Sequence, residues 1–150
     1  MIANEDLIRK FYTAFQQRDF LTMQSCYHPD ATFSDPVFQN LNSKEVKAMW
    51  QMLLTSSKDL RVEFSNITSN SCHWEAWYSF SRTGRQVHNI IDATMEFKDG
   101  LIYKHKDHFD FWRWSRQALG LPGLVLGWTP MISNKVRTTA RERLDKFQIR

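Results

Sequence analysis

Two stretches of the 150-residue chain place acidic and imidazole side chains among bulky apolar ones. Asp35 closes an alternating segment at 31–35, and His105 and Asp107 are two residues apart in a second alternating segment. Burial in apolar surroundings raises the pKa of a carboxyl group, and a second carboxylate nearby raises it further. Asp35 or Asp107 is therefore a candidate general base or acid near neutral pH, with His105 as its natural partner.

The segments that carry these side chains have the period of two that is typical of β-strands. We expect strands at 31–35, 60–67, 72–81, 86–97 and 101–112. Thr83-Gly84 and Asp99-Gly100 supply the turns that join the last three of them. Because strands joined in sequence by short turns pair antiparallel, the sequence predicts an antiparallel sheet.

Alternation decides which of these side chains share a face of the sheet. His105, Asp107 and Phe109 fall on one face of the last strand, and Asn89 and Ile91 fall on the matching face of its neighbour. We expect them to surround a mainly apolar cavity with a few polar groups, which is the usual composition of a small-molecule site. The residues expected to contact the ligand are Phe11, Phe33, Trp50, Leu54, Tyr78, Asn89, Ile91 and Phe109.

Alternation also places several polar residues on the opposite face. Asp92, His73 and His88 point away from the predicted cavity, so they cannot join His105 and Asp107 in a metal site, and we expect neither metal nor cofactor. A structural role for the acids is the alternative. Asp107 and His105 could form a satisfied pair, and Asp35 could cap the turn before residue 36.

Helical periodicity frames these strands. It predicts helices at 4–18, 19–28, 42–54 and 114–120, a loop at 121–130, and a last helix from Ser133 or Asn134 onward. Asn4 is the expected N-cap of the first helix, and Asn42 with Glu45 forms a capping-box pair for the third. We divide the chain into one domain at 1–132 and a basic amphipathic helix at 133–150 that packs on the domain or on a partner.

Composition limits the partners. The chain carries a net charge of +4, but the segment 111–150 alone carries +6, so the remaining 110 residues sum to −2. A basic tail without a nucleic-acid-binding motif makes nucleic acid an unexpected partner. The two cysteines lack metal-ligand spacing, and no run of 18 apolar residues occurs. We therefore expect a cytoplasmic protein with reduced cysteines, without a membrane partner and without a secretion signal at its N-terminus.

The order of helices and strands, together with three motifs, resembles the NTF2-like superfamily. Tyr-His-Pro-Asp-Ala-Thr-Phe-Ser-Asp-Pro-Val at 27–37 resembles the first strand of ketosteroid isomerases. Phe-Lys-Asp-Gly-Leu-Ile at 97–102 and Lys-Asp-His-Phe-Asp at 106–110 resemble the last hairpin of SnoaL-like proteins and limonene-epoxide hydrolases. The resemblance covers about residues 4–118. It implies an α+β cone, with a curved antiparallel sheet wrapped around three N-terminal helices, and a homodimer. Bulky outward residues such as Trp77 and Ile90 indicate that the outer sheet face meets the second subunit.

The resemblance also implies roles for individual residues. Asp35 matches the carboxylate base of the steroid isomerases, but Phe11 and Ala93 stand where those enzymes carry their two oxyanion donors. Asp107 matches an aspartate of the epoxide hydrolases, although the segment 73–81 lacks the arginine that accompanies it there. A hydroxyl donor could instead come from Tyr78.

The sequence thus predicts a protein that binds a small hydrophobic molecule and catalyses, if it is an enzyme, cofactor-free proton transfer. Asp35 is the expected base, and Asp107 with His105 forms the acid or water-positioning pair. Two alternatives remain open. One is a non-catalytic ligand-binding or dimeric interaction module, and the other is water activation of the epoxide-hydrolase kind.

Overall fold

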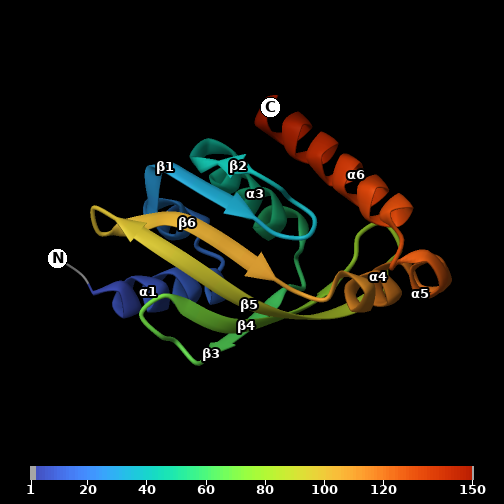
Figure 1. Ribbon diagram of the computed structural model, residues 1–150, viewed down its shortest axis with the longest axis horizontal. Coiled ribbons are helices and arrows are strands. Elements are labelled where there is room, and N and C mark those ends of the chain that lie inside the picture. The colour runs from blue at the N-terminus through green and yellow to red at the C-terminus, as the bar shows by residue number, and fades with distance from the viewer. Residues whose placement is uncertain (1–2, 150) are drawn as a thin grey trace.

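A six-stranded curved sheet with the order β2-β1-β6-β5-β4-β3 forms the framework of the molecule (Figure 1). The computed structural model describes residues 3–149, so Met1, Ile2 and Arg150, which the predicted terminal segments include, lie outside the described residues. The strands are β1 (Tyr27–Ser34), β2 (Leu41–Asn42), β3 (Arg61–Ser65), β4 (Ser71–Ser79), β5 (Gln86–Lys98) and β6 (Leu101–His108). The predicted α+β cone is confirmed.

Six helices accompany the sheet in the described part of the chain. They are α1 (Asn4–Gln16), α2 (Phe20–Ser25), α3 (Ser43–Ser56), α4 (Phe111–Leu119), α5 (Leu121–Leu126) and α6 (Pro130–Ile149). Helices α1 and α3 cover one face of the sheet, while α4 and α5 form one end of the molecule and α6 runs back beside α3 (Figure 1). The space between α1, α3 and the sheet becomes the core.

Strand pairing follows the predicted hairpins with one exception. β3, β4, β5 and β6 pair antiparallel in sequence, and positive φ angles of 54° at Asp99 and 74° at Gly100 make the tight turn between the last two. β1 pairs with β6 in the parallel direction, with Phe33 opposite His105. A parallel neighbour needs a long crossover, here all of the chain between β1 and β6, so local turn signals do not reveal it.

Several predicted boundaries are wrong, each for a local reason. Tyr27 does not end the second helix but opens β1, because it pairs with Ile102 of β6. The last strand stops at His108 because the side chain of Asp110 accepts a hydrogen bond from the backbone N–H of Arg113 and caps α4. The N-cap of α1 is residue 3, not residue 4, and it makes no side-chain cap.

The stretch after α4 is helical where the sequence predicts a loop. α5 occupies 121–126, and Pro122 lies in its first turn, where a missing N–H group costs no hydrogen bond. The last helix begins at Pro130, before the predicted caps Ser133 and Asn134. Proline and glycine in this stretch therefore mark helix ends and close packing, and not a loop.

Two sets of polar hydrogen bonds, one at each end, hold α3 in place. The capping box predicted from Asn42 and Glu45 is present, with both reciprocal hydrogen bonds formed. At the other end, the guanidinium of Arg18 donates to the carbonyl oxygens of Leu54, Ser57 and Leu60 at 2.5, 2.6 and 3.2 Å. The bonds to Leu54 and Ser57 satisfy carbonyl groups that the end of α3 leaves open, and the bond to Leu60 ties down the loop that follows. The register of α3, which carries Trp50, is thus set at both ends.

The last helix packs on the domain. Leu144 is fully buried in the main hydrophobic core, and Arg141 forms an ion pair with Glu45 of α3. The Nε group of Arg137 donates to the carbonyl of Pro36 at 2.9 Å. Within residues 3–149, no helix combines the length and apolar character needed to cross a membrane.

Asn42→Ala should lower the free energy of unfolding by about 1 kcal/mol, because the first turn of α3 loses its side-chain acceptor. Chemical denaturation monitored by circular dichroism measures the loss. Lys44→Ala, at an exposed position of the same turn, is the control and should change stability by less than about 0.5 kcal/mol. Equal effects of the two variants would contradict the capping role.

Candidate functional site

A cavity of about 200 Å³ lies between the inner sheet face, α3, α4 and α6. Its wall is mostly apolar, and the predicted site residues that line it are Asp35, Trp50, Tyr78, Asn89, Ile91, Asp107 and Phe109. Strand alternation thus brings together residues from β4, β5 and β6, and the turn after β1 adds Asp35. The volume is below the usual 300–1,000 Å³ of drug-sized pockets, so the cavity suits a compact molecule.

Four other predicted site residues do not line this cavity. Phe11, Phe33, Leu54 and His105 are buried in the core behind its wall. Phe11 and Phe33 pack edge-on against the ring of His105, at centroid distances of 5.8 and 4.9 Å. They hold the imidazole and have no access to a ligand.

A chain of three hydrogen bonds leads from α3 to the cavity. Trp50 Nε1 donates to the hydroxyl oxygen of Tyr27 at 2.9 Å, and that hydroxyl lies 2.8 Å from His105 Nδ1. His105 Nε2 lies 2.9 Å from Asp107 Oδ1. Since the Tyr27 oxygen accepts from the indole, its proton is available for Nδ1, which leaves the imidazole proton on Nε2 facing the carboxylate.

This chain of hydrogen bonds fixes the orientation of the Asp107 side chain. The side chains of His105 and Asp107 are 0% and 3% exposed, so the pair is shielded from bulk water. The imidazole donates to one carboxylate oxygen and fixes the orientation of the group, as in other carboxylate–histidine pairs. His105 therefore positions Asp107, which is the member of the pair that reaches the cavity.

Asp35 lies after the end of β1 and combines two roles. Its Oδ1 accepts hydrogen bonds from the backbone N–H groups of Val37 and Phe38 at 2.7 and 2.6 Å, so it caps the turn as one of the sequence alternatives states. It also lines the cavity. The pKa of Asp35 is raised to about 7. Burial is the main cause and the carboxylate of Asp107 adds to it, while the two N–H groups and Arg137 oppose the rise.

Two neutral polar groups complete the cavity wall. Asn89 is buried against the cavity, and no hydrogen-bond partner for its amide is found among residues 3–149. The Tyr78 oxygen accepts a hydrogen bond from Trp114 Nε1 at 2.8 Å, so its own proton remains available. Burial raises the pKa of Tyr78 to about 12, which keeps the hydroxyl protonated at neutral pH.

Sequence reasoning missed several contributors. Tyr27 joins Trp50 to His105, but the sequence pattern places it in the predicted helix at 19–28. Trp114 and the α6 residues Val136, Ala140 and Arg143 also line the cavity, and none of them is among the predicted site residues. The aromatic content of 111–114 was the available signal for Trp114, whereas no local signal could have placed α6 over the cavity.

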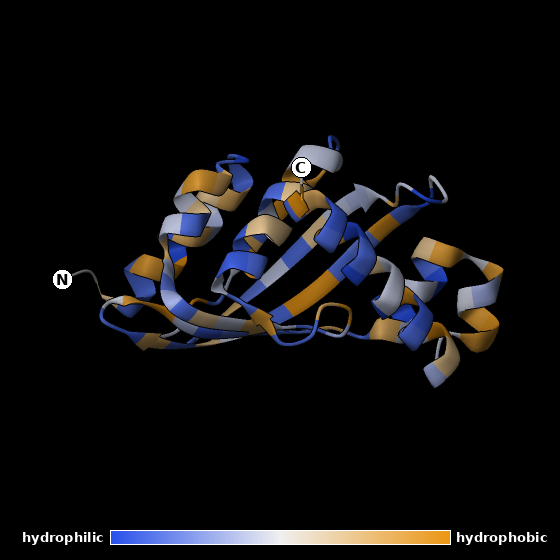
Figure 2. Cartoon of the chain, turned by 90° about the horizontal axis from the view of Figure 1, so that it is seen from above, coloured by the Kyte–Doolittle hydropathy of each residue, from blue (hydrophilic) through white to orange (hydrophobic). Residues whose placement is uncertain are grey.

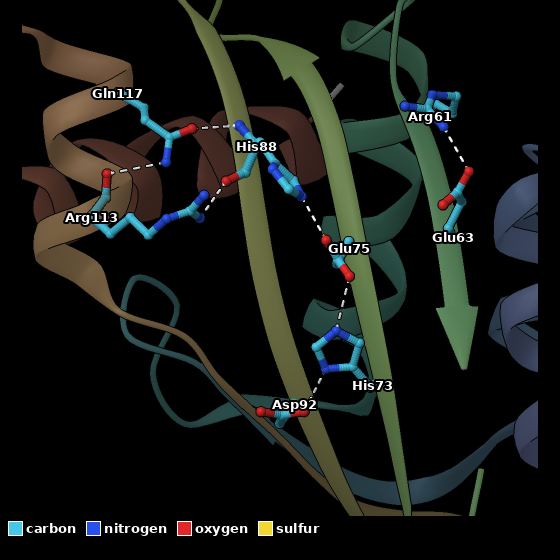
Figure 3. A network of polar contacts seen from close by, with 8 residues as sticks. All are labelled: Arg61, Glu63, His73, Glu75, His88, Asp92, Arg113 and Gln117. Atoms are coloured by element: carbon cyan, nitrogen blue, oxygen red, sulfur yellow. Dashed lines mark hydrogen bonds and ion pairs between the residues drawn. The ribbon is translucent and has the colours of Figure 1, made fainter. Parts of the chain in front are cut away.

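The outer face of the sheet carries a separate polar cluster (Figure 3). His73 lies within hydrogen-bonding distance of Asp92 and Glu75, at 2.8 and 3.0 Å, and His88 lies 2.6 Å from Glu75. The hydrogen bonds that His73 donates to Asp92 and then to Glu75 raise the pKa of His73. The cluster is on the face that alternation predicts, away from the cavity, and the described residues contain no group of three or more side chains suited to a metal ion.

Comparison with known proteins identifies the fold. The family model for the SnoaL-like domain matches residues 8–105. IdmH, a proposed polyketide cyclase from Streptomyces antibioticus, superposes with a TM-score of 0.65 at 20% identity, covering 80% of this chain and 100% of that chain. AclR, a proposed hydroxylase from Streptomyces galilaeus, gives 0.65 at 16% identity, covering 88% of this chain and 97% of its own.

A third solved structure of this fold is a LEH-like epoxide hydrolase from M. tuberculosis, with a TM-score of 0.58 at 18% identity, covering 83% of this chain and 96% of that chain. At these identities the similarity shows the fold alone. Among curated proteins, none matches the chain. Asp107 and α6 lie beyond the segment that the family model matches.

Tyr27→Phe should lower the free energy of unfolding by about 1–3 kcal/mol, because the buried Trp50 Nε1 and His105 Nδ1 atoms both lose their partner. Urea denaturation measures the change. Tyr103→Phe serves as the control, since no hydrogen bond of the Tyr103 hydroxyl is found among residues 3–149. A Tyr27→Phe variant as stable as the control would show that the chain does not hold this site together.

The raised pKa of Asp35 predicts a pH-dependent stability. The folded protein retains a proton between pH 3.8 and about 7 that the unfolded chain has released, so stability from this group falls as pH rises through that window. The slope is at most about 1.4 kcal/mol per pH unit. Thermal unfolding from pH 4 to pH 8 measures it. Asp35→Asn should flatten this part of the profile, whereas a profile identical to that of the wild type would contradict the assignment.

Proposed function

Because the chain belongs to the SnoaL-like domain family, we propose that it binds a compact apolar molecule with a carbonyl or hydroxyl group and moves a proton on it without a cofactor. The observation that supports this proposal is the cavity itself. It places the carboxyl groups of Asp35 and Asp107 in one apolar enclosure with two neutral polar side chains, Tyr78 and Asn89. Titratable groups in such a cleft are candidates for acid–base chemistry.

Asp35 is the proposed base. Its pKa of about 7 leaves a substantial ionised fraction at neutral pH, and a base of that strength also returns a proton readily. It would take a proton from the carbon next to the carbonyl group, leaving the electron pair as an enolate with its charge on oxygen. Return of the same proton to a different carbon completes an isomerisation with no change in composition.

The enolate oxygen requires a donor. The positions used for that purpose in the ketosteroid isomerases hold Phe11 and Ala93, which have no side-chain donor. The Tyr78 hydroxyl supports this role, since its oxygen already accepts from Trp114 and its proton is free. Tyr78 and Asp35 line the same cavity, which supports a donor and a base acting on one ligand.

Asp107 has a different proposed role. His105 donates to one of its oxygens and holds the group as an acceptor in the cavity wall. A fixed acceptor can receive a hydrogen bond from a hydroxyl group of the ligand or from a water molecule. This role orients the substrate and does not require Asp107 to change its protonation state.

A non-catalytic binding protein is the second candidate. It is favoured by one observation, namely that Oδ1 of Asp35 already accepts two backbone hydrogen bonds and contributes to the turn before Pro36. In that case the cavity would bind its ligand without turnover. The homodimer through the outer sheet face and the cytoplasmic location remain proposals alongside it.

A thermal-shift screen with small apolar ketones and hydroxyketones identifies ligands, and NMR in D₂O then follows exchange of carbon-bound hydrogen. Asp35→Asn should reduce the exchange rate by about 10²–10⁴-fold while the ligand still raises the melting temperature, because the amide cannot accept the proton. Tyr78→Phe should also slow exchange.

Asp30→Asn is the matched control, since Asp30 is an exposed acid on β1 and should leave exchange unchanged. Binding by the wild type without any exchange would instead establish the non-catalytic candidate. Exchange that survives Asp35→Asn would remove this residue from the role of base.

A further inference from the structure

Helix α5 packs against α4 through a glycine and exposes its large apolar side chains. Gly123 and the C-cap residue Gly127 face α4: a Cβ atom on Gly123 would lie 1.9 Å from the backbone oxygen of Ser115, and one on Gly127 would lie 2.0 Å from Ser115 Oγ. The opposite side of the helix carries Leu121 and Val125, which are 71% and 55% exposed. A surface helix normally turns its large apolar side chains to the core, whereas α5 turns a glycine inward and leaves these side chains exposed.

The outward residues of α5 continue into a larger surface, which we call the apolar tip. Its members are Trp112, Leu121, Leu124, Val125, Trp128 and Met131. They make up most of the large hydrophobic side chains that are exposed on the described residues. The tip projects at one end of the molecule (Figure 1), where α5 is coloured as hydrophobic in Figure 2. An exposed apolar surface of this kind marks an interaction site.

The carbonyl groups at the C-terminal end of α5 all accept hydrogen bonds from within the protein. The last four carbonyl groups of a helix have no partner within it, and in α5 all four are satisfied by nearby donors. Backbone N–H groups of Gly127 and Thr129 donate to residues 123 and 126 at 2.9 Å each. The indole groups of Trp112 and Trp128 donate to residues 124 and 125 at 3.2 and 3.0 Å. The helix end can therefore enter an apolar medium without leaving a polar group unpaired.

The chain segment that carries the apolar tip holds charges of one sign. Between Asp110 and Glu142 the chain holds no acidic residue and five basic ones, Arg113, Arg116, Lys135, Arg137 and Arg141. The Arg116 guanidinium lies 4.3 Å from the centre of the Trp112 ring, and Lys135 follows Met131 by one helical turn. An apolar surface with a cationic border complements an anionic one.

We propose that the apolar tip docks on the surface of an anionic lipid membrane. Leu121, Leu124 and Val125 would enter the boundary between head groups and acyl chains, and Arg116 and Lys135 would contact the head groups. The expectation of no membrane partner rests on the absence of a spanning segment, and a surface contact of this kind needs none. A second copy of the chain fits less well, because a symmetric contact would place these cations against each other. The proposal does not depend on the proposed function.

Co-sedimentation of the full chain with vesicles tests the proposal. The wild type should bind vesicles of phosphatidylglycerol and phosphatidylcholine, bind phosphatidylcholine alone much more weakly, and lose affinity as salt is added. Leu124→Ser with Val125→Ser should weaken binding by about tenfold or more, because both side chains lose their apolar transfer free energy. Lys135→Gln should weaken binding to anionic vesicles only.

Leu21→Ser is the matched control, since Leu21 is a 68% exposed apolar residue on α2 and its change should leave vesicle binding unaltered. The substituted side chains are exposed, and an unchanged melting temperature confirms that each variant folds. Absence of binding, equal binding to neutral vesicles, or binding insensitive to the double substitution would overturn the proposal. A dimer in light scattering that the double substitution abolishes, without vesicle binding, would assign the apolar tip to a second copy and overturn it as well.

Discussion

The hydrogen-bond chain from Trp50 through Tyr27 and His105 to Asp107 is the constraint on which the interior depends. It joins α3, β1 and β6 in a region without bulk water, where each unpaired polar group would be costly. The indole can only donate and the carboxylate can only accept, so the direction of every bond between them is set. This polarity explains why the parallel pairing of β1 with β6 matters, since it brings Tyr27 and His105 onto one network.

The cavity is a joint product of the family domain and the added last helix. The segment matched by the SnoaL-like model supplies most of the sheet and α3, and α6 adds Val136, Ala140 and Arg143 to the cavity wall. Asp35 is influenced by both parts: burial raises its pKa, and Arg137 partly offsets that rise. Its proton affinity thus depends on how α6 sits, in addition to the sequence of the turn that carries it.

Strand alternation was sufficient to predict which side chains face inward, because parity is fixed once a strand is recognised. Asn89, Ile91 and Asp107 reach the cavity as predicted. Parity gives the face but not the depth, so it could not show that Phe11 and His105 lie behind the wall. The fold class followed from element order and motifs. The parallel pairing, the start of β1 and the placement of α6 depend on contacts between distant segments, which local periodicity does not contain.

Gly123 limits which substitutions α5 can accept during evolution. The backbone of α4 occupies the space that any side chain there would need, whereas the neighbouring positions 124 and 125 face outward and carry no such restriction. Descendants of this sequence can therefore exchange Leu124 and Val125 without a clash, but replacement of Gly123 requires α5 to move away from α4. In a future alignment of relatives, this single position would record which lineages inherited the orientation of the helix and which abandoned it.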